Sequence, residues 1–130
     1  MQIRVYYEDT DCGNVVYYAN YLRYMERSRT EFLRERGIEL SDWWKKGILF
    51  VVVEANVKYR APARYNDLLE VESTVTELTS ASVTFTTTIH RSRGPLLVKG
   101  TIRLACTDIP GRIKRIPEEI HAVLQPPEGN

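Results

Sequence analysis

Two acidic residues lie just ahead of a long amphipathic segment near the start of the chain. Asp9 and Asp11 are followed by the turn-forming pair Gly13-Asn14, and helical periodicity begins at about Tyr17. Residues two apart in an extended segment point the same way, so the two carboxylates share one side. The first N–H groups of a helix lack intrahelical partners and carry the positive end of the helix dipole. Such groups can polarise a carbonyl oxygen while a nearby carboxylate acts on the carbonyl carbon as base or nucleophile. The arrangement therefore indicates chemistry of the acyl-hydrolysis type.

The same acids also have an ordinary structural interpretation. Asp is common in turns and at helix N-caps, so Asp9 and Asp11 could serve there alone. A calcium loop starting at Asp9 would place its glycine one position early and Asn20 where a bidentate Glu is needed. No His or Cys spacing typical of a metal site occurs elsewhere, so no metal is predicted. The sequence also lacks a Gly-x-Ser-x-Gly elbow and a Gly-rich phosphate loop.

The helix that would position these groups runs from about residue 17 to residue 36. Apolar residues recur there at i, i+3, i+4 and i+7 and predict one buried face. Gly37 follows two arginines, an order typical of a helix C-terminus. Arg29 falls inside the apolar face with Glu26 at its edge, which allows an Arg29–Glu26 pair, a partner on the sheet, or a stem that reaches solvent. The predicted face comprises Tyr18, Tyr21, Leu22, Met25, Ser28, Phe32 and Leu33.

Most of the chain from Ile48 to Ile109 alternates between apolar and polar residues, the pattern of antiparallel strands with one buried face. A single helix of about five turns and a one-sided sheet bury each other best when the sheet curves around the helix. The predicted fold is therefore α+β, with short helices near residues 41–47 and 117–124. The alternating segments are 53–60, 70–76, 82–90 and 98–107, preceded by a short strand at 2–7.

Composition restricts the class of protein further. The 130 residues, 43% hydrophobic and 27% charged, predict one ordinary domain spanning 1–130. A formal net charge of +1 argues against nucleic acid or an anionic membrane as partner. No apolar run approaches the roughly 20 residues that span a bilayer, and no signal-peptide pattern occurs. Cys12 and Cys106 form no disulfide framework, which favours a cytoplasmic location. Cys12 also lacks the basic partner that a thiolate nucleophile requires.

Two stretches of the sequence resemble the 4-hydroxybenzoyl-CoA thioesterase family, and within it the small acyl-CoA thioesterases associated with the bacterial Tol-Pal system. The first runs from Tyr7 through Glu-Asp-Thr-Asp-x-Gly-x-Val-Val to Tyr17, and continues through Asn20-Tyr21 and Glu-Arg-Ser-Arg-Thr-Glu at 26–31. The second, 57–67, is a strand that leads into Ala-Pro-Ala-Arg and an Asp. The chain is therefore similar to this family over most of its length.

The resemblance implies the hotdog fold, in which an antiparallel sheet of about five strands wraps one long central helix. It also implies thioester hydrolysis without a metal or cofactor, in dimers or tetramers with active sites between subunits. The family's catalytic carboxylate matches Asp11, and its oxyanion-binding backbone N–H matches Tyr18. Tol-Pal-associated members usually carry His where this chain has Tyr18, a difference that leaves the backbone role intact.

The sequence thus predicts a cytoplasmic acyl-CoA thioesterase that forms a homo-oligomer. Whether Asp11 attacks the thioester or activates water stays open at this point. A non-catalytic hotdog protein that binds acyl thioesters or a protein partner is the main alternative. A hotdog dehydratase would need a His-based acid–base pair, and His90 and His121 lie far from the helix start in sequence. The weak candidates for binding the CoA phosphates are Arg60, Arg64, Arg91, Arg93 and Lys99.

Overall fold

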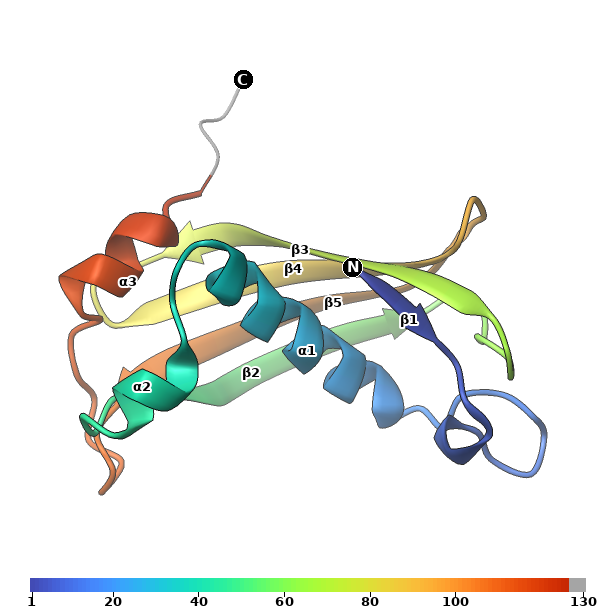
Figure 1. Ribbon diagram of the computed structural model, residues 1–130, viewed down its shortest axis with the longest axis horizontal. Coiled ribbons are helices and arrows are strands. Elements are labelled where there is room, and N and C mark those ends of the chain that lie inside the picture. Colours follow the sequence, from blue (N-terminus) through green and yellow to red (C-terminus); the bar gives the residue numbers. More distant parts are fainter. Residues whose placement is uncertain (127–130) are drawn as a thin grey trace.

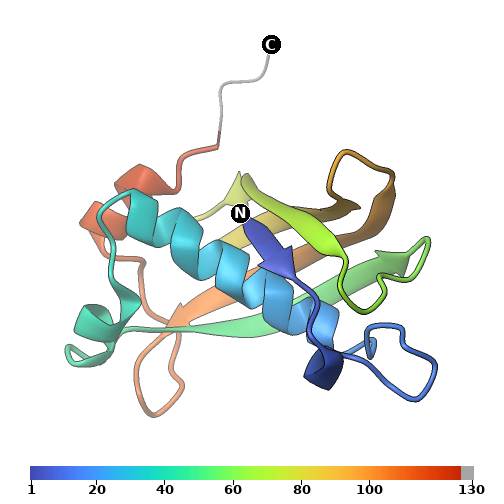
Figure 2. The same cartoon turned by 45° about the vertical axis from the view of Figure 1, so that its right-hand side comes forward.

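The computed structural model describes residues 1–126, and its main feature is a twisted antiparallel sheet with one long helix across it (Figure 1). Helix α1 (Asn20–Glu35) lies over one face, while α2 (Leu40–Trp44) and α3 (Glu118–Val123) lie together at one end of the sheet (Figure 2). The five strands pair in the order β1-β3-β4-β5-β2, so β1 and β2 form the two edges. Their bounds are β1 Gln2–Arg4, β2 Leu49–Tyr59, β3 Leu68–Leu78, β4 Ser82–Arg91 and β5 Leu96–Thr107.

The central strands bury the face that their alternating pattern predicts. Along β5, buried Gly100, Ile102 and Leu104 alternate with exposed Lys99, Thr101 and Arg103. The register aligns Ile102 with Phe85 of β4, and buried Val71 of β3 pairs with Ile89 of β4. Side chains from three strands therefore form one apolar surface beneath α1. An antiparallel sheet around a long helix is the hotdog arrangement, and the predicted α+β class is confirmed.

Helix α1 packs on the sheet through a few close contacts, one of them with Gly100 of β5. A Cβ atom at Gly100 would lie 2.6 Å from the sulfur of Met25, so any larger residue there must displace the Met25 side chain. Further along the helix, the rings of Phe32 and Phe85 meet edge to face at 5.3 Å between centroids. The Ser28 and Ser73 hydroxyls also lie 2.7 Å apart, a polar link between helix and sheet. These contacts fix the height and direction of α1, and with them the position of its N-terminus.

The observed elements correct the predicted boundaries in several places. The first strand ends at Arg4 rather than residue 7, because residues Tyr7–Asp9 form a 3₁₀ turn, η1. Helix α1 begins at Asn20 rather than residue 17, because the first turn before it has 3₁₀ rather than α hydrogen bonds. Tyr18 and Leu22 are exposed, whereas Tyr24, absent from the predicted face, is fully buried. Tyr24 is covered because the N-terminal end of α1 has the segment around η1 beside it, a tertiary contact that periodicity cannot reveal.

Strand β2 departs most from its predicted burial. The alternation at 53–60 predicts one buried face, yet Val53 and Tyr59 are each 49% exposed. This strand is an edge of the sheet, so only β5 flanks it. Most of its side chains are therefore left open, whichever face they occupy.

No helix among the described residues is long and apolar enough to cross a membrane.

Candidate active site

Asp11 is held on a narrow loop between β1 and α1. Its N–H donates to the carbonyl of Val15 at 3.0 Å, and its own carbonyl accepts from Asn14 N–H at 3.1 Å. Asn14 adopts a left-handed conformation with φ of 59°, which asparagine tolerates well. The N–H of Gly13 donates to Asp11 Oδ1 at 2.9 Å, and residues 1–126 supply no donor to Oδ2. One carboxylate oxygen is therefore anchored and the other is available at the surface.

The backbone just before α1 presents an N–H group without an internal acceptor. The carbonyl of Tyr17 accepts from Asn20 N–H at 2.9 Å, and that of Tyr18 accepts from Tyr21 N–H at 3.3 Å. These bonds make the segment from Tyr17 an opening turn that continues into α1. Within residues 1–126 the Tyr18 N–H has no hydrogen-bond acceptor, the state expected of the first amides of a helix. Such a group is suited to hold a carbonyl oxygen on which negative charge develops.

The carbonyl of Asp9 connects the Asp11 loop to the start of α1. It accepts from the N–H of Tyr17 and from Nδ2 of Asn20, each at 2.9 Å. The Asp9 carboxylate accepts from Tyr6 N–H at 2.9 Å and closes η1. Asp9 therefore has the capping role that its position suggested. Asn20 is buried and was not singled out by sequence analysis; its position as the first α1 residue of the Asn-Tyr signature is the one signal that could have indicated it.

The second sequence signature packs directly against this loop. Val16 N–H donates to the carbonyl of Ala63 at 2.9 Å, and Tyr65 N–H donates to the carbonyl of Asn14 at 3.0 Å. The N–H of Ala63 in turn donates to the hydroxyl oxygen of Tyr21 on α1 at 2.9 Å. The two family-like stretches, about 40 residues apart in sequence, thus form one hydrogen-bonded unit around Asp11.

Tyrosines surround this unit, some buried and some exposed. Burial raises the pKa of the Tyr24 phenol well above its usual range, and the nearby Asp9 charge adds to the effect. The Tyr24 hydroxyl is buried without a partner among residues 1–126, and Tyr24 also lines a small polar cavity of about 190 Å³. At the surface, the Tyr17 and Tyr18 rings lie 4.8 Å apart between centroids, and the Tyr18 hydroxyl raises the pKa of the Tyr17 phenol. The Tyr18 side chain is 62% exposed, so it lies outside the core.

The five candidate phosphate-binding cations have different surroundings. Arg64 lies next to the Asp11 loop, since its backbone forms an isolated β-bridge with Val15. Arg91 Nε lies 3.1 Å from the Asp67 carboxylate, and its Nη2 donates to the carbonyl of Pro62 at 3.3 Å. Arg91 thus holds the loop between β2 and β3 in place. The remaining three are exposed: Arg60 after β2, Arg93 in the turn between β4 and β5, and Lys99 on the outer face of β5.

Comparison with known proteins places this geometry in a family. The sequence model of the Thioesterase superfamily matches residues 13–98. The acyl-CoA thioester hydrolase YbgC of Escherichia coli is 40% identical over 106 residues, 82% of this chain and 79% of that protein. The acyl-CoA thioesterase YbgC of Haemophilus influenzae is 40% identical over 125 residues, 94% of this chain and 90% of that protein. The crystal structure of a hypothetical protein from Aquifex aeolicus superposes with a TM-score of 0.90 at 30% sequence identity. The superposition covers 96% of this chain and 98% of the Aquifex aeolicus chain. The chain therefore belongs to the thioesterase superfamily.

Proposed function

We propose that this protein is an enzyme that hydrolyses acyl-CoA thioesters, with Asp11 as the catalytic carboxylate and the Tyr18 N–H as oxyanion donor. The observation that carries the assignment of residues is the link through Asp9. Its carbonyl joins the loop of Asp11 to Tyr17 and Asn20, on either side of the unsatisfied Tyr18 N–H. The names of the Escherichia coli and Haemophilus influenzae relatives support the substrate class.

Two routes fit this arrangement. The thioester oxygen accepts a hydrogen bond from Tyr18 N–H, which favours negative charge on that oxygen as the carbonyl carbon is attacked. In the first route Asp11 attacks the carbon, the C–S bond breaks, and water then hydrolyses the resulting anhydride. In the second, Asp11 removes a proton from a water molecule that attacks directly. Either route consumes one water and yields a carboxylic acid and the CoA thiol.

We also infer that the protein assembles with further copies of itself. Strand β2 is an edge strand of eleven residues, and Val51, Val52 and Val53 are exposed along it. A long apolar edge promotes unwanted association unless something covers it. A second copy pairing along β2 would cover this edge and extend the sheet. The assembly could stop at a dimer or continue to a tetramer.

We propose that exposed cations bind the substrate's phosphates. Arg64 is the first candidate because its backbone bridges to the Asp11 loop, followed by Arg60, Arg93 and Lys99. Arg91 supports the site indirectly through Asp67. Both cysteines are free thiols, which fits a reducing cytoplasm. We further propose that residues 1–130 form a single domain.

Turnover of a panel of acyl-CoAs, from short aliphatic to aromatic, tests the proposed function. Cys12 is an exposed thiol, so a thiol-reactive dye would label the protein itself. Loss of the thioester's ultraviolet absorbance is the better measurement. We expect hydrolysis of at least one member of the panel. If every member bound without turnover, the protein would be a non-catalytic binder of acyl thioesters.

A further inference from the structure

A second cavity lies along α1, away from the catalytic loop. Its volume is about 370 Å³, within the range of about 300–1,000 Å³ typical of small-molecule sites. It opens between α1, α2 and the sheet, toward the end that carries α2. Its apolar walls include Leu33, Leu40, Phe50, Val83, Phe85 and Leu104.

One wall of this cavity carries a buried cation without an acceptor. Arg29 is only 9% exposed, and no residue in the range 1–126 hydrogen-bonds to its guanidinium or forms an ion pair with it. Of the alternatives that the sequence left open for Arg29, neither the pair with Glu26 nor a partner on the sheet occurs among residues 1–126, although Glu26 also lines the cavity. Burial lowers the pKa of Arg29, and the charge of Glu26 opposes this effect. A buried charge normally has a partner because its desolvation is costly.

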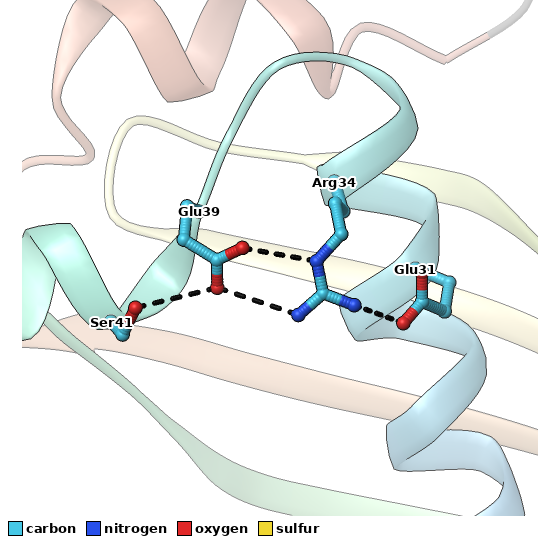
Figure 3. Close-up of polar contacts among 4 residues, drawn as sticks. All are labelled: Glu31, Arg34, Glu39 and Ser41. Carbon is cyan, nitrogen blue, oxygen red and sulfur yellow. Dashed lines mark hydrogen bonds and ion pairs between the residues drawn. The ribbon is translucent and has the colours of Figure 1, made fainter.

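Among the charged side chains that line the cavity, Arg29 is the cation without an anionic partner in residues 1–126. Arg34 pairs with Glu31 and Glu39, and Ser41 donates to Glu39, so these side chains satisfy one another at the rim (Figure 3). Glu26 is exposed to solvent, which screens it. The cavity therefore combines an apolar interior with one mostly buried guanidinium that has no acceptor among residues 1–126.

We propose that this cavity binds a free carboxylic acid with an apolar chain, its carboxylate on Arg29 and its chain against Leu33 and Phe85. A guanidinium presents two parallel N–H donors that match a carboxylate, and such charge-assisted bonds are among the strongest in proteins. The recessed position of Arg29 suits a slender ligand better than a flat protein surface. Tyr18 and Arg29 are eleven positions apart, about 16 Å along the helix, so the site is distinct from the catalytic loop. The proposal does not depend on hydrolysis.

Calorimetric titration of the full chain with octanoate, compared with 1-octanol, tests the proposal. Both probes have the same chain length, but only octanoate carries the carboxylate. We expect octanoate to bind the wild-type protein at least about tenfold more tightly than octanol. Arg29→Met should remove this preference and leave the octanol affinity unchanged. Its melting temperature should not fall, because a buried charge without a partner is replaced by an apolar side chain.

Arg23→Met is the matched control, since it removes the same charge from an exposed position on the same helix. Asp11→Asn should bind octanoate as the wild type does, which separates this site from the catalytic one. The proposal fails if octanoate and octanol bind equally, or if Arg29→Met retains the preference for octanoate. It also fails if octanoate does not bind and Arg29→Met dissociates an oligomer, because a second copy would then supply the acceptor.

Discussion

Asp9 and Asp11 are two positions apart and have different hydrogen-bond environments. The Asp9 carboxylate caps η1 through Tyr6, and its carbonyl serves Tyr17 and Asn20. The Asp11 carboxylate accepts one N–H, from Gly13, and exposes its second oxygen. A capping acid stabilises the folded chain, whereas an acid with an available oxygen can react. The two should therefore respond differently to the same substitution.

Replacing Asp11 with Asn should abolish most of the activity while preserving the fold. The amide retains the bond from Gly13 but lacks the anionic oxygen needed for attack or for water activation. We expect kcat to fall at least about 100-fold, with a smaller change in KM. Asp9→Asn should lower the melting temperature through a weakened cap and affect kcat far less. Steady-state kinetics and thermal unfolding of both variants measure this; a reversed pattern would move the catalytic role to Asp9.

Asn20 should behave as a positioning residue. Asn20→Ala removes the bond to the Asp9 carbonyl, which retains only the N–H of Tyr17. The Asp11 loop should then lie less accurately beside Tyr18, and kcat should fall by about tenfold or more. KM should change little, since Asn20 is buried. Thr101→Ala on the exposed face of β5 is the control, and equal kinetics in the two variants would refute the role.

At the scale of elements, the length of α1 and its contacts with the sheet set the position of the Tyr18 N–H. The helix was predicted from periodicity, and its end at Glu35 followed from the residues before Gly37. Its start was misplaced, because aromatic residues at 17 and 18 continue the helical pattern although their backbone forms a 3₁₀ turn. Sequence periodicity does not distinguish the two kinds of turn, which differ in hydrogen-bond partner rather than in residue type.

Gly100→Ala should destabilise the protein by about 1–3 kcal/mol. The new methyl group would lie 2.6 Å from the Met25 sulfur, and Met25 is fully buried. Met25→Ala combined with Gly100→Ala should cost less than the sum of the single changes, because the two side chains compete for one space. Thr101→Ala, on the exposed face of β5, should stay within about 0.5 kcal/mol. Urea unfolding of the four variants gives these values; strict additivity would show that the contact is not limiting.

At the scale of the whole molecule, the alternating pattern predicted the strands but not their order in the sheet. The hotdog fold and its central helix could be anticipated from local pattern and resemblance, whereas the roles of Asp11 and Tyr18 stay predictions. The exposure of β2 could not, because an apolar alternating strand has the same pattern in the centre of a sheet and at an edge that a partner covers. The unpaired state of Arg29 was equally hidden, since it depends on which elements surround the cavity.

Static light scattering should show a homo-oligomer at micromolar concentration. Val51→Lys combined with Val53→Lys places charges along the exposed β2 edge, a device that prevents strand pairing. We expect this variant to form a smaller species than the wild type. It should also lose activity, because the proposed sites lie between subunits. Lys substitution at exposed Glu72 of β3 serves as a control. A monomeric wild-type protein would exclude sites shared between subunits.

The hydrogen bonds that join the two family-like stretches also bear on how the protein moves. Val16 N–H to Ala63, Tyr65 N–H to Asn14, and the reciprocal bonds between Val5 and residues 66–67 form a continuous backbone layer. These amides should open together as one cooperative unit and exchange their hydrogens with deuterium at similar free energies. The loop of Asp11 cannot then swing aside alone to admit substrate. Access to the proposed site at Asp11 must then come from movement of the tyrosine side chains beside it or of the whole layer.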